Sequence, residues 1–409
     1  MKLNIKVFFL CLIALPVLSW GAAPNNFLVI TDIHLSQTIP AKSMVINPPK
    51  LSAAYDLDST TFDNFISVLN KNIQNKIVAQ PDFIILLGDL AGHNSVPDDT
   101  IKSEAYVFNK LKTTFPNTPI FYTFGNNDSL VKDYGTFSRE ASPKNPYEVA
   151  INSQWEDGFL SIGKMCSSTP DKYPCIINKN VDNGFYSAYI QPGLRLISLN
   201  SVMFSPKREG VTDAQSSAEL TWLSNQLQDA SQQTESVLIT MHIPPGHQIF
   251  NDVKYWKNDS DQTQFIQTIE KYNSSIIGIL AGHTHREEFK IITDNGKLIT
   301  GVYFTAALST SLGNAPSVKT FYYSNTDGKW QLTSSETFYF TGTNQNPVLN
   351  KLYEFKNYYC NNSAVSLFDC VTSVNTNNIP DLMKKYITSG NPNLGDSVKV
   401  PDAIMINVK

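Results

Sequence analysis

Five short polar motifs contain the residue types that could carry chemistry in this chain of 409 residues. The motifs are Asp32-Ile-His34, Gly88-Asp89-Leu-Ala-Gly-His93-Asn94, Gly125-Asn126-Asn127-Asp128, His242-Ile-Pro-Pro-Gly-His247 and Gly282-His283-Thr-His285. They include all six histidines of the protein. Carboxylate, imidazole and amide groups without a thiolate suit divalent cations such as zinc, manganese, iron or magnesium. Two such ions need about seven or eight ligand contacts, with one carboxylate bridging, and the motifs supply that number.

Each motif lies just after a short apolar segment with the composition of a buried strand. The segments are rich in Val, Ile, Leu and Phe and do not alternate strictly with polar residues, which is typical of strands buried on both faces. In α/β sheets the loops at the carboxyl ends of the strands meet at one crevice, so we expect the motifs to form one site. The predicted strands are 27–30, 83–87, 120–122, 194–199, 237–241, 276–280 and 302–305.

Amphipathic helical patterns separate several of these strands. Phe62, Phe65, Ile66 and Leu69 recur at i, i+3, i+4, i+7 spacing, and such a stripe packs one face of a helix on a core. The strand–helix alternation predicts a layered α/β domain over residues 24–340. The pattern is interrupted at about 140–185, which we interpret as an insertion.

The last part of the chain has a different pattern. Apolar residues at helical spacing predict a C-terminal helical extension over residues 341–409. They are Leu352, Phe355 and Tyr359, followed by Leu382, Met383 and Tyr386.

The first 23 residues have the order of a secretory signal peptide. Lys2 and Lys6 precede an apolar run over 7–18, and small residues follow up to Ala23. This run is shorter than the ~20 residues that a membrane-spanning helix needs, although a retained anchor is the alternative. We expect cleavage, a secreted or periplasmic location and no stable membrane insertion.

Four cysteines remain after that segment: Cys166, Cys175, Cys360 and Cys370. An even number in an exported chain predicts disulfide bonds. Three pairings are possible, and we favour pairing between nearest neighbours. Metal binding is the alternative, but neither pair has the spacing of metal ligands.

Composition excludes several classes of protein. Hydrophobic residues make up 42% and charged residues 17% of the chain, which excludes a disordered protein. The formal charge of −4, from 32 basic and 36 acidic residues, argues against duplex nucleic acid or an anionic membrane as a partner.

The order of the five motifs resembles that of the calcineurin-like metallophosphoesterase superfamily. Within it, His242-Ile-Pro-Pro-Gly-His247, Gly88-Asp89-X-X-X-His93 and the Thr305-Ala-Ala-Leu-Ser-Thr-Ser segment after His285 resemble the acid sphingomyelinase-like phosphodiesterases. The resemblance covers about residues 26–335. It implies an α/β fold, a layered β-sandwich flanked by helices, with a small C-terminal helical appendage.

The resemblance also implies a ligand set for two metal ions. Asp89 would bridge the two ions. One ion would be held by Asp32, His34, Asp89 and His285, and the other by Asp89, Asn126, His242 and His283. We expect zinc, with manganese, iron or magnesium as alternatives.

One departure from the family pattern affects catalysis. The family has a histidine after Gly-Asn, where this chain has Asn127. Asparagine can donate a hydrogen bond but cannot transfer a proton at neutral pH. We therefore expect His93 to act as the general acid, with Asp128 or water as alternatives, and His247 and Asn94 to orient a ligand or contact substrate.

The expected function is that of an exported dimetal phosphodiesterase, in which a metal-activated hydroxide attacks a phosphodiester or phosphoanhydride. The resemblance implies a small phosphate-containing substrate, such as a nucleotide or a phosphocholine compound, and we expect a monomer. The alternatives are a sphingomyelin phosphodiesterase, a polyphosphatase, a phosphomonoesterase and a catalytically silent metal-binding module. No saposin-like domain fits before Asp32, which favours a soluble substrate.

Overall fold

The structure is a computed structural model that describes residues 25–39, 46, 56–93, 95–138, 165–170, 172–249, 253–310, 313–374, 379–390 and 405–407. The expected signal peptide, Asn94 and most of the expected insertion at 140–185 lie outside the described residues. In the part that is described, no helix has the length and apolar composition needed to cross a membrane.

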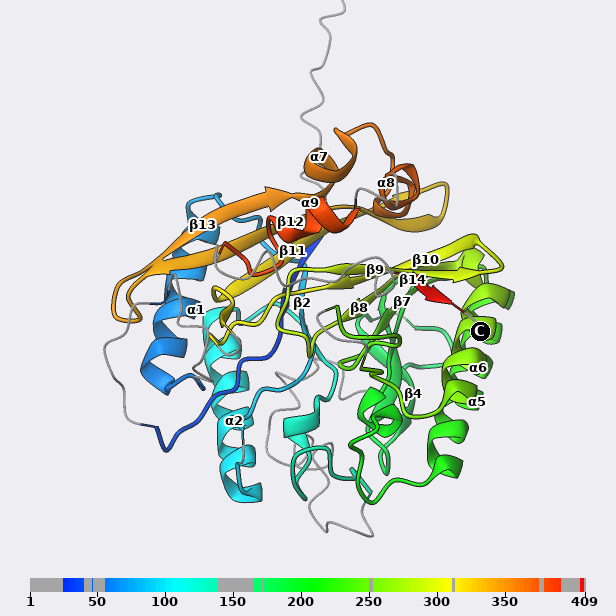
Figure 1. Cartoon of the computed structure of the whole chain (residues 1–409), viewed down its shortest axis with the longest axis horizontal. Helices are drawn as coiled ribbons and strands as arrows, with labels where there is room; N and C mark the ends of the chain where they lie inside the picture. The colour runs from blue at the N-terminus through cyan, green and yellow to red at the C-terminus, as the bar shows by residue number, and fades with distance from the viewer. Residues whose placement is uncertain are drawn as a thin grey trace, which may run out of the picture.

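Two mixed sheets form the centre of the fold (Figure 1). The six-stranded sheet has the order β13 (Pro347–Glu354), β12 (Lys329–Gly342), β11 (Ser317–Thr326), β1 (Asn25–Ile30), β2 (Phe83–Leu86) and β3 (Ile120–Tyr122). Strands β1, β2 and β3 pair in parallel, and the pairs β1–β11, β11–β12 and β12–β13 are antiparallel. The eight-stranded sheet has the order β14 (Met405–Asn407), β9 (Phe289–Asp294), β10 (Lys297–Phe304), β8 (Ile276–Ala281), β7 (Ser236–Thr240), β6 (Leu194–Ser198), β5 (Phe185–Gln191) and β4 (Cys175–Asn180). Buried residues of both sheets belong to one hydrophobic core.

Helices flank both sheets (Figure 1). Helices α1 (Ser59–Gln74) and α2 (Pro97–Thr114) lie beside the six-stranded sheet, and α5 (Asp213–Gln232) and α6 (Asp259–Lys271) beside the other. Short 3-10 helices η1 (Asn126–Asp128), η2 (Ser201–Phe204) and η3 (Asn273–Ser275) occur in loops. The expected α/β class, with layered sheets flanked by helices, is confirmed.

The predicted strands and the predicted helical stripe correspond to elements of the structure. All seven predicted strands are strands of the two sheets, and their residues are almost completely buried. The predicted stripe Phe62, Phe65, Ile66 and Leu69 is the buried face of α1. This helix begins after Asp58, whose Oδ1 accepts a hydrogen bond from the Thr61 backbone N–H at 3.0 Å. A carboxylate at that position satisfies a free amide of the first turn.

The region after residue 340 differs in part from the helical expectation. Helices α7 (Phe355–Cys360), α8 (Leu367–Ser373) and α9 (Ile379–Lys384) are present, but strand β13 precedes them at the edge of the six-stranded sheet. Leu352 lies in this strand and not in a helix. Pro347 and Leu349 are buried, and Val348 between them is exposed. This period of two belongs to a strand, and the helical spacing of residues 352–359 spans a strand–helix junction.

Two disulfide bonds join the nearest neighbours. Cys166 pairs with Cys175 and Cys360 with Cys370, with Cα–Cα distances of 5.0 and 5.4 Å. The second bond connects the end of α7 to α8. The pairing that we favoured is the one present, so these thiols are not available as metal ligands.

Glu219 of α5 gives a prediction of pH-dependent stability. Its side chain is fully buried, Oε1 accepts the Asn200 backbone N–H at 2.7 Å, and Oε2 has no hydrogen-bond partner among the described residues. Burial raises its pKa well above the usual range. Because the folded state binds the proton more tightly, this group destabilises the fold as the pH rises from the unfolded pKa towards the folded one.

We therefore expect Glu219→Gln to stabilise the protein at pH 8 and not at pH 4. The gain should be about 1.4 kcal/mol for each pH unit between the unfolded pKa and either the native pKa or pH 8, whichever is lower. Thermal unfolding at both pH values measures it, with exposed Glu209→Gln as the control. An equal change at both pH values would contradict the prediction.

Candidate metal centre

The predicted ligands lie in loops that follow five strands of the two sheets. Asp32 and His34 follow β1, Asp89 follows β2 and Asn126 follows β3. From the other sheet, His242 follows β7, and His283 and His285 follow β8. Thr123 Oγ1, just after β3, lies 2.8 Å from Ser198 Oγ and donates a hydrogen bond to Thr240 Oγ1 at 2.7 Å. These contacts fix the strand ends of the two sheets against each other.

The loops bring six of the ligands into two adjacent clusters. Potential donor atoms of Asp32, His34 and His285 lie within 4.8 Å of one another, as do those of Asp89, His242 and His283. In the first cluster, His285 Nε2 lies 3.1 Å from His34 Nε2 and 3.2 Å from Asp32 Oδ1.

Asp89 lies between the two clusters. Its Oδ2 is 3.3 Å from His242 Nε2 in its own cluster and 3.8 Å from His34 Nε2 in the other. This position is compatible with the bridging role that the resemblance implies for Asp89.

Three of the predicted ligand atoms are buried without a hydrogen-bond partner among the described residues: Asp32 Oδ1, Asn126 Oδ1 and His242 Nε2. The other polar atom of each side chain is held in place. Asp32 Oδ2 accepts hydrogen bonds from Thr31 Oγ1 at 2.7 Å and the His283 backbone N–H at 3.0 Å.

Asn126 and His242 are oriented in the same way. Asn126 Nδ2 donates to Asp133 Oδ1 at 2.8 Å. His242 Nδ1 lies 2.6 Å from Leu87 O, so this nitrogen carries a proton and Nε2 is the nitrogen that remains for a metal ion. An unsatisfied buried polar atom costs about 1–3 kcal/mol, which a cation would relieve. The donor set therefore fits divalent metal ions.

The electrostatics of the site also favour a cation. Burial alone lowers the pKa of His242, but the carboxylates of Asp89 and Asp32 raise it to about 10. Burial, together with the charge on His242, lowers the pKa of its neighbour His283 to about 3. Positive charge is thus favoured at His242, between Asp89 and Asp32, and disfavoured at His283.

The backbone of the site is strained. Five predicted ligands adopt left-handed φ angles between 48° and 69°: Asp32, His34, Asp89, His283 and His285. Each such residue costs about 1–2 kcal/mol. Packing is tight as well, because a Cβ on Gly125 would lie 2.3 Å from the Asp89 backbone nitrogen. Strain of this kind is tolerated where side-chain direction serves a function.

Asn127 and Asp128 contact Asp89. The Asn127 backbone N–H and Nδ2 donate to Asp89 Oδ1 and Oδ2, each at 2.8 Å. The buried Asp128 carboxylate accepts the backbone N–H groups of Asp89, Leu90 and Gly125 at 2.7–2.8 Å. Burial and repulsion from Asp89 raise its pKa to about 6. This geometry favours positioning of the Asp89 loop over the proton transfer for which Asp128 was the alternative.

His93 lies at the rim of the first cluster. Its side chain is 38% exposed, and its Nδ1 lies 2.7 Å from Asp56 Oδ1. Burial lowers its pKa, but the hydrogen bond and charge of Asp56 outweigh that effect and the pKa is raised. The imidazole stacks on His34 with 4.0 Å between ring centroids and 10° between planes. A single cation cannot lie in the plane of both stacked rings, so His34, Asp56 and His93 do not suit a further metal ion.

The other sequence-predicted residues are less informative. His247 is half-buried, and its backbone carbonyl accepts a hydrogen bond from Lys290 Nζ at 2.8 Å. Asn94 lies outside the described residues.

Four neighbours of the site were not predicted. Asp56 and Asp133 orient His93 and Asn126, and the rings of Tyr134 and Tyr255 meet His283 edge-on at 6.2 and 5.7 Å. Tyr134 and Asp133 follow the Gly125 motif closely, which is the one local signal for them.

Asp133 gives a prediction about metal affinity. Without its carboxylate, the Asn126 amide loses the hydrogen bond that turns Oδ1 towards the site. We expect Asp133→Ala to weaken the binding of one metal ion by about 10–100-fold. Equilibrium dialysis against a competing chelator measures the affinity.

The matched control is Asp133→Asn, which retains an acceptor oxygen and should bind metal nearly as well as the unmodified chain. Equal affinities of the alanine variant and the unmodified chain would contradict the role of Asp133.

Comparison with known proteins agrees with this geometry. The calcineurin-like phosphoesterase family matches residues 26–287. Sphingomyelinase phosphodiesterase D of Dictyostelium discoideum is 26% identical over 420 residues, which cover 93% of this chain and 89% of that protein.

Two further relatives are similar over most of their length. Human acid sphingomyelinase-like phosphodiesterase 3b is 24% identical, covering 75% of this chain and 70% of that protein. A cyclic GMP-AMP phosphodiesterase of Bos taurus is 25% identical, covering 76% and 70%. The resemblance to acid sphingomyelinase-like phosphodiesterases is confirmed. The chain belongs to the calcineurin-like phosphoesterase family, whose members are metal-dependent phosphoric ester hydrolases with a dinuclear metal centre.

Proposed function

We propose that this protein is an exported dimetal phosphodiesterase that hydrolyses a phosphodiester or phosphoanhydride bond. The observation that carries the proposal is the pair of adjacent clusters, in which Asp89 of one lies 3.8 Å from His34 of the other. Three of the predicted ligand atoms have no hydrogen-bond partner among the described residues. In this proposal Asp32, His34, Asp89 and His285 hold one ion, and Asp89, Asn126, His242 and His283 hold the other.

Two divalent ions, zinc in our proposal, would supply positive charge to the phosphoryl oxygens and lower the pKa of a water molecule. The protein contributes the orientation of the ligands. Thr31, Leu87 and Asp133 fix the side chains of Asp32, His242 and Asn126, so each ligand atom needs little rearrangement.

His93 donates a proton to the leaving-group oxygen in this proposal. Despite burial, the hydrogen bond and charge of Asp56 raise the pKa of His93, which favours the protonated imidazole, and the bond from Nδ1 to Asp56 leaves Nε2 as the donor. Asn127 keeps Asp89 in place but does not replace the proton donor.

The names of the relatives support a phosphodiester substrate. One is named a sphingomyelinase phosphodiesterase and another a cyclic GMP-AMP phosphodiesterase. We propose a soluble nucleotide or phosphocholine-type substrate, with sphingomyelin as the alternative. The two disulfide bonds support export, since such bonds persist in oxidising compartments.

A substrate panel tests this function. We expect hydrolysis of bis-p-nitrophenyl phosphate and of one or more of ATP, cyclic GMP-AMP and sphingomyelin, with loss of at least about 95% of the rate when a chelator lowers the metal occupancy. Readdition of zinc or manganese should restore the rate. Hydrolysis of p-nitrophenyl phosphate in preference to the diesters would instead identify a phosphomonoesterase. If no substrate is hydrolysed in a chelator-sensitive manner, the chain is a metal-binding module and the proposal is wrong.

A further inference from the structure

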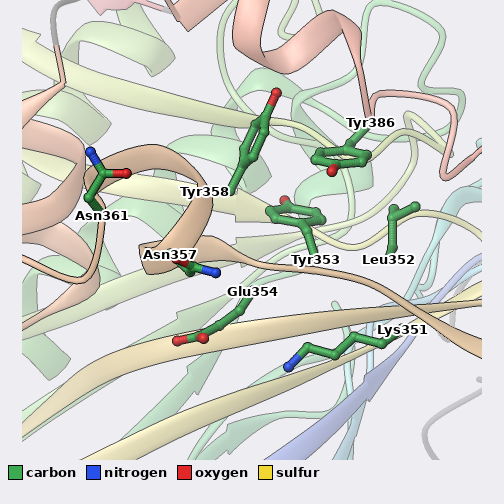
Figure 2. Close-up of a pocket in the computed structure, with 8 residues that line it drawn as sticks. All are labelled: Lys351, Leu352, Tyr353, Glu354, Asn357, Tyr358, Asn361 and Tyr386. Carbon is green, nitrogen blue, oxygen red and sulfur yellow. The ribbon is translucent and has the colours of Figure 1, made fainter.

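A hollow formed by residues 351–386 contains none of the predicted metal ligands in its lining. It has a volume of about 580 Å³, within the usual range for small-molecule sites. Strand β13, helix α7 and the segment after α9 form it, as Figure 2 shows. We call it the tyrosine hollow, and it is lined by Lys351, Leu352, Tyr353, Glu354, Asn357, Tyr358, Asn361 and Tyr386.

Three tyrosine rings make its aromatic wall (Figure 2). The rings of Tyr353 and Tyr386 are parallel, with 4.7 Å between centroids and 5° between planes. Tyr358 stands at 64° to Tyr386, again with 4.7 Å between centroids. Tyr353 and Tyr386 therefore cover one face of each other, and Tyr358 stands at a steep angle to this pair.

Hydrogen bonds and a disulfide fix this wall. Tyr353 donates to buried Glu287 at 2.7 Å, and Tyr358 donates to the Leu382 carbonyl at 3.0 Å. The Cys360–Cys370 bond holds the end of α7. Because the rings are already positioned, binding of a ligand would not carry the entropic cost of ordering them.

The polar lining carries balanced charge. Lys351 forms an ion pair with Glu336, and Glu354 accepts a hydrogen bond from Ser334 Oγ at 2.9 Å. The hollow therefore favours neither an anion nor a cation. The ammonium group of Lys385 also lies 5.0 Å from the Tyr386 centroid and 5.4 Å from that of Tyr358, so a cationic ligand would meet a like charge there.

A neutral ligand with many hydroxyl groups satisfies these conditions. The side-chain amides of Asn357 and Asn361 each offer donors and an acceptor, and Glu354 offers an acceptor. A tyrosine face packs well against the C–H face of a pyranose ring, because the ring is apolar and its hydroxyl is polar. We propose that the tyrosine hollow binds a sugar unit of a glycan, either in a polysaccharide or in a glycolipid headgroup.

The full-length chain can be tested on a microarray of immobilised glycans and then by calorimetric titration with N,N′-diacetylchitobiose, maltose and lactose. We expect one of these classes to bind with Kd of about 1 mM or tighter, as for a small site with few polar contacts. Tyr358→Ala and Asn357→Ala should each weaken binding at least about tenfold, the loss of one well-placed contact. Tyr106→Ala on α2, another half-buried tyrosine, should leave binding unchanged.

Binding of the protein to phosphatidylcholine vesicles with and without glucosylceramide distinguishes the two sources of sugar. Binding that depends on glucosylceramide supports a glycolipid headgroup as the ligand. The proposal is overturned if neither the array nor the glycolipid vesicles bind, if binding survives in both variants, or if choline chloride binds in place of the sugars. Metal content measured in parallel should be equal in all variants, since none of the altered residues belongs to the metal centre.

Discussion

Asp89→Asn is expected to lower phosphodiester hydrolysis by at least about 10³-fold, equivalent to about 4 kcal/mol of transition-state stabilisation. The carboxylate lies between the two clusters, with Oδ2 3.3 Å from His242 Nε2 and 3.8 Å from His34 Nε2. An amide has no negative charge to share between two cations and offers a single oxygen. We therefore also expect the bound metal to fall from two ions to one or fewer. Metal analysis of the purified variant and turnover of bis-p-nitrophenyl phosphate check both effects.

The control is Asp63→Asn on helix α1, which removes a carboxylate of similar shape outside the site. It should retain both ions and full turnover. The Asp89 variant should also remain folded, because Asn can still accept one hydrogen bond from Asn127. If Asp89→Asn keeps two ions and normal turnover, Asp89 does not bridge them.

The sequence predicted that the candidate ligands lie together, because each of them follows a predicted strand. Asp32, Asp89 and His242 each follow an apolar segment that forms a buried strand. The change from apolar to polar residues marks the end of each strand in the sequence. Parallel strands then bring their carboxyl ends together.

Residues that act on the ligands lack such a signal. Asp56 reaches His93 from 37 positions away in the chain, with no motif around it. Its contact with His93 depends on the tertiary structure, about which the local sequence contains no information. Similarly, nothing in the order Gly125-Asn126-Asn127-Asp128 indicated that the last carboxylate would accept hydrogen bonds from three backbone amides.

The edge strand β13 illustrates a second limit. Leu352, Phe355 and Tyr359 have helical spacing, yet Leu352 belongs to a strand that pairs with β12. Whether a short apolar segment joins a sheet depends on a free neighbouring edge, and in this fold that edge belongs to β12. Local periodicity contains no information about it.

His93→Ala is expected to lower turnover of a substrate with an alkoxide leaving group by about 10²–10⁴-fold, the range for removal of a general acid. Metal content should not change, because Asp56 binds His93 Nδ1 and no predicted ligand depends on His93 for a hydrogen bond. Simultaneous loss of metal and turnover would assign His93 to the metal centre.

Substrates with different leaving groups distinguish proton donation by His93 from its other possible roles. A p-nitrophenolate leaves without needing a proton. His93→Ala should therefore slow the hydrolysis of bis-p-nitrophenyl phosphate much less than it slows the hydrolysis of an alkyl phosphodiester. A residue that only positions substrate, or that supports His34 through the ring stack at 4.0 Å, would affect both substrates equally. Asp56→Asn should reproduce the same selectivity to a smaller degree, because the imidazole is retained but is no longer paired with a carboxylate. Equal losses on both substrates would therefore assign His93 a structural role and leave water as the proton donor.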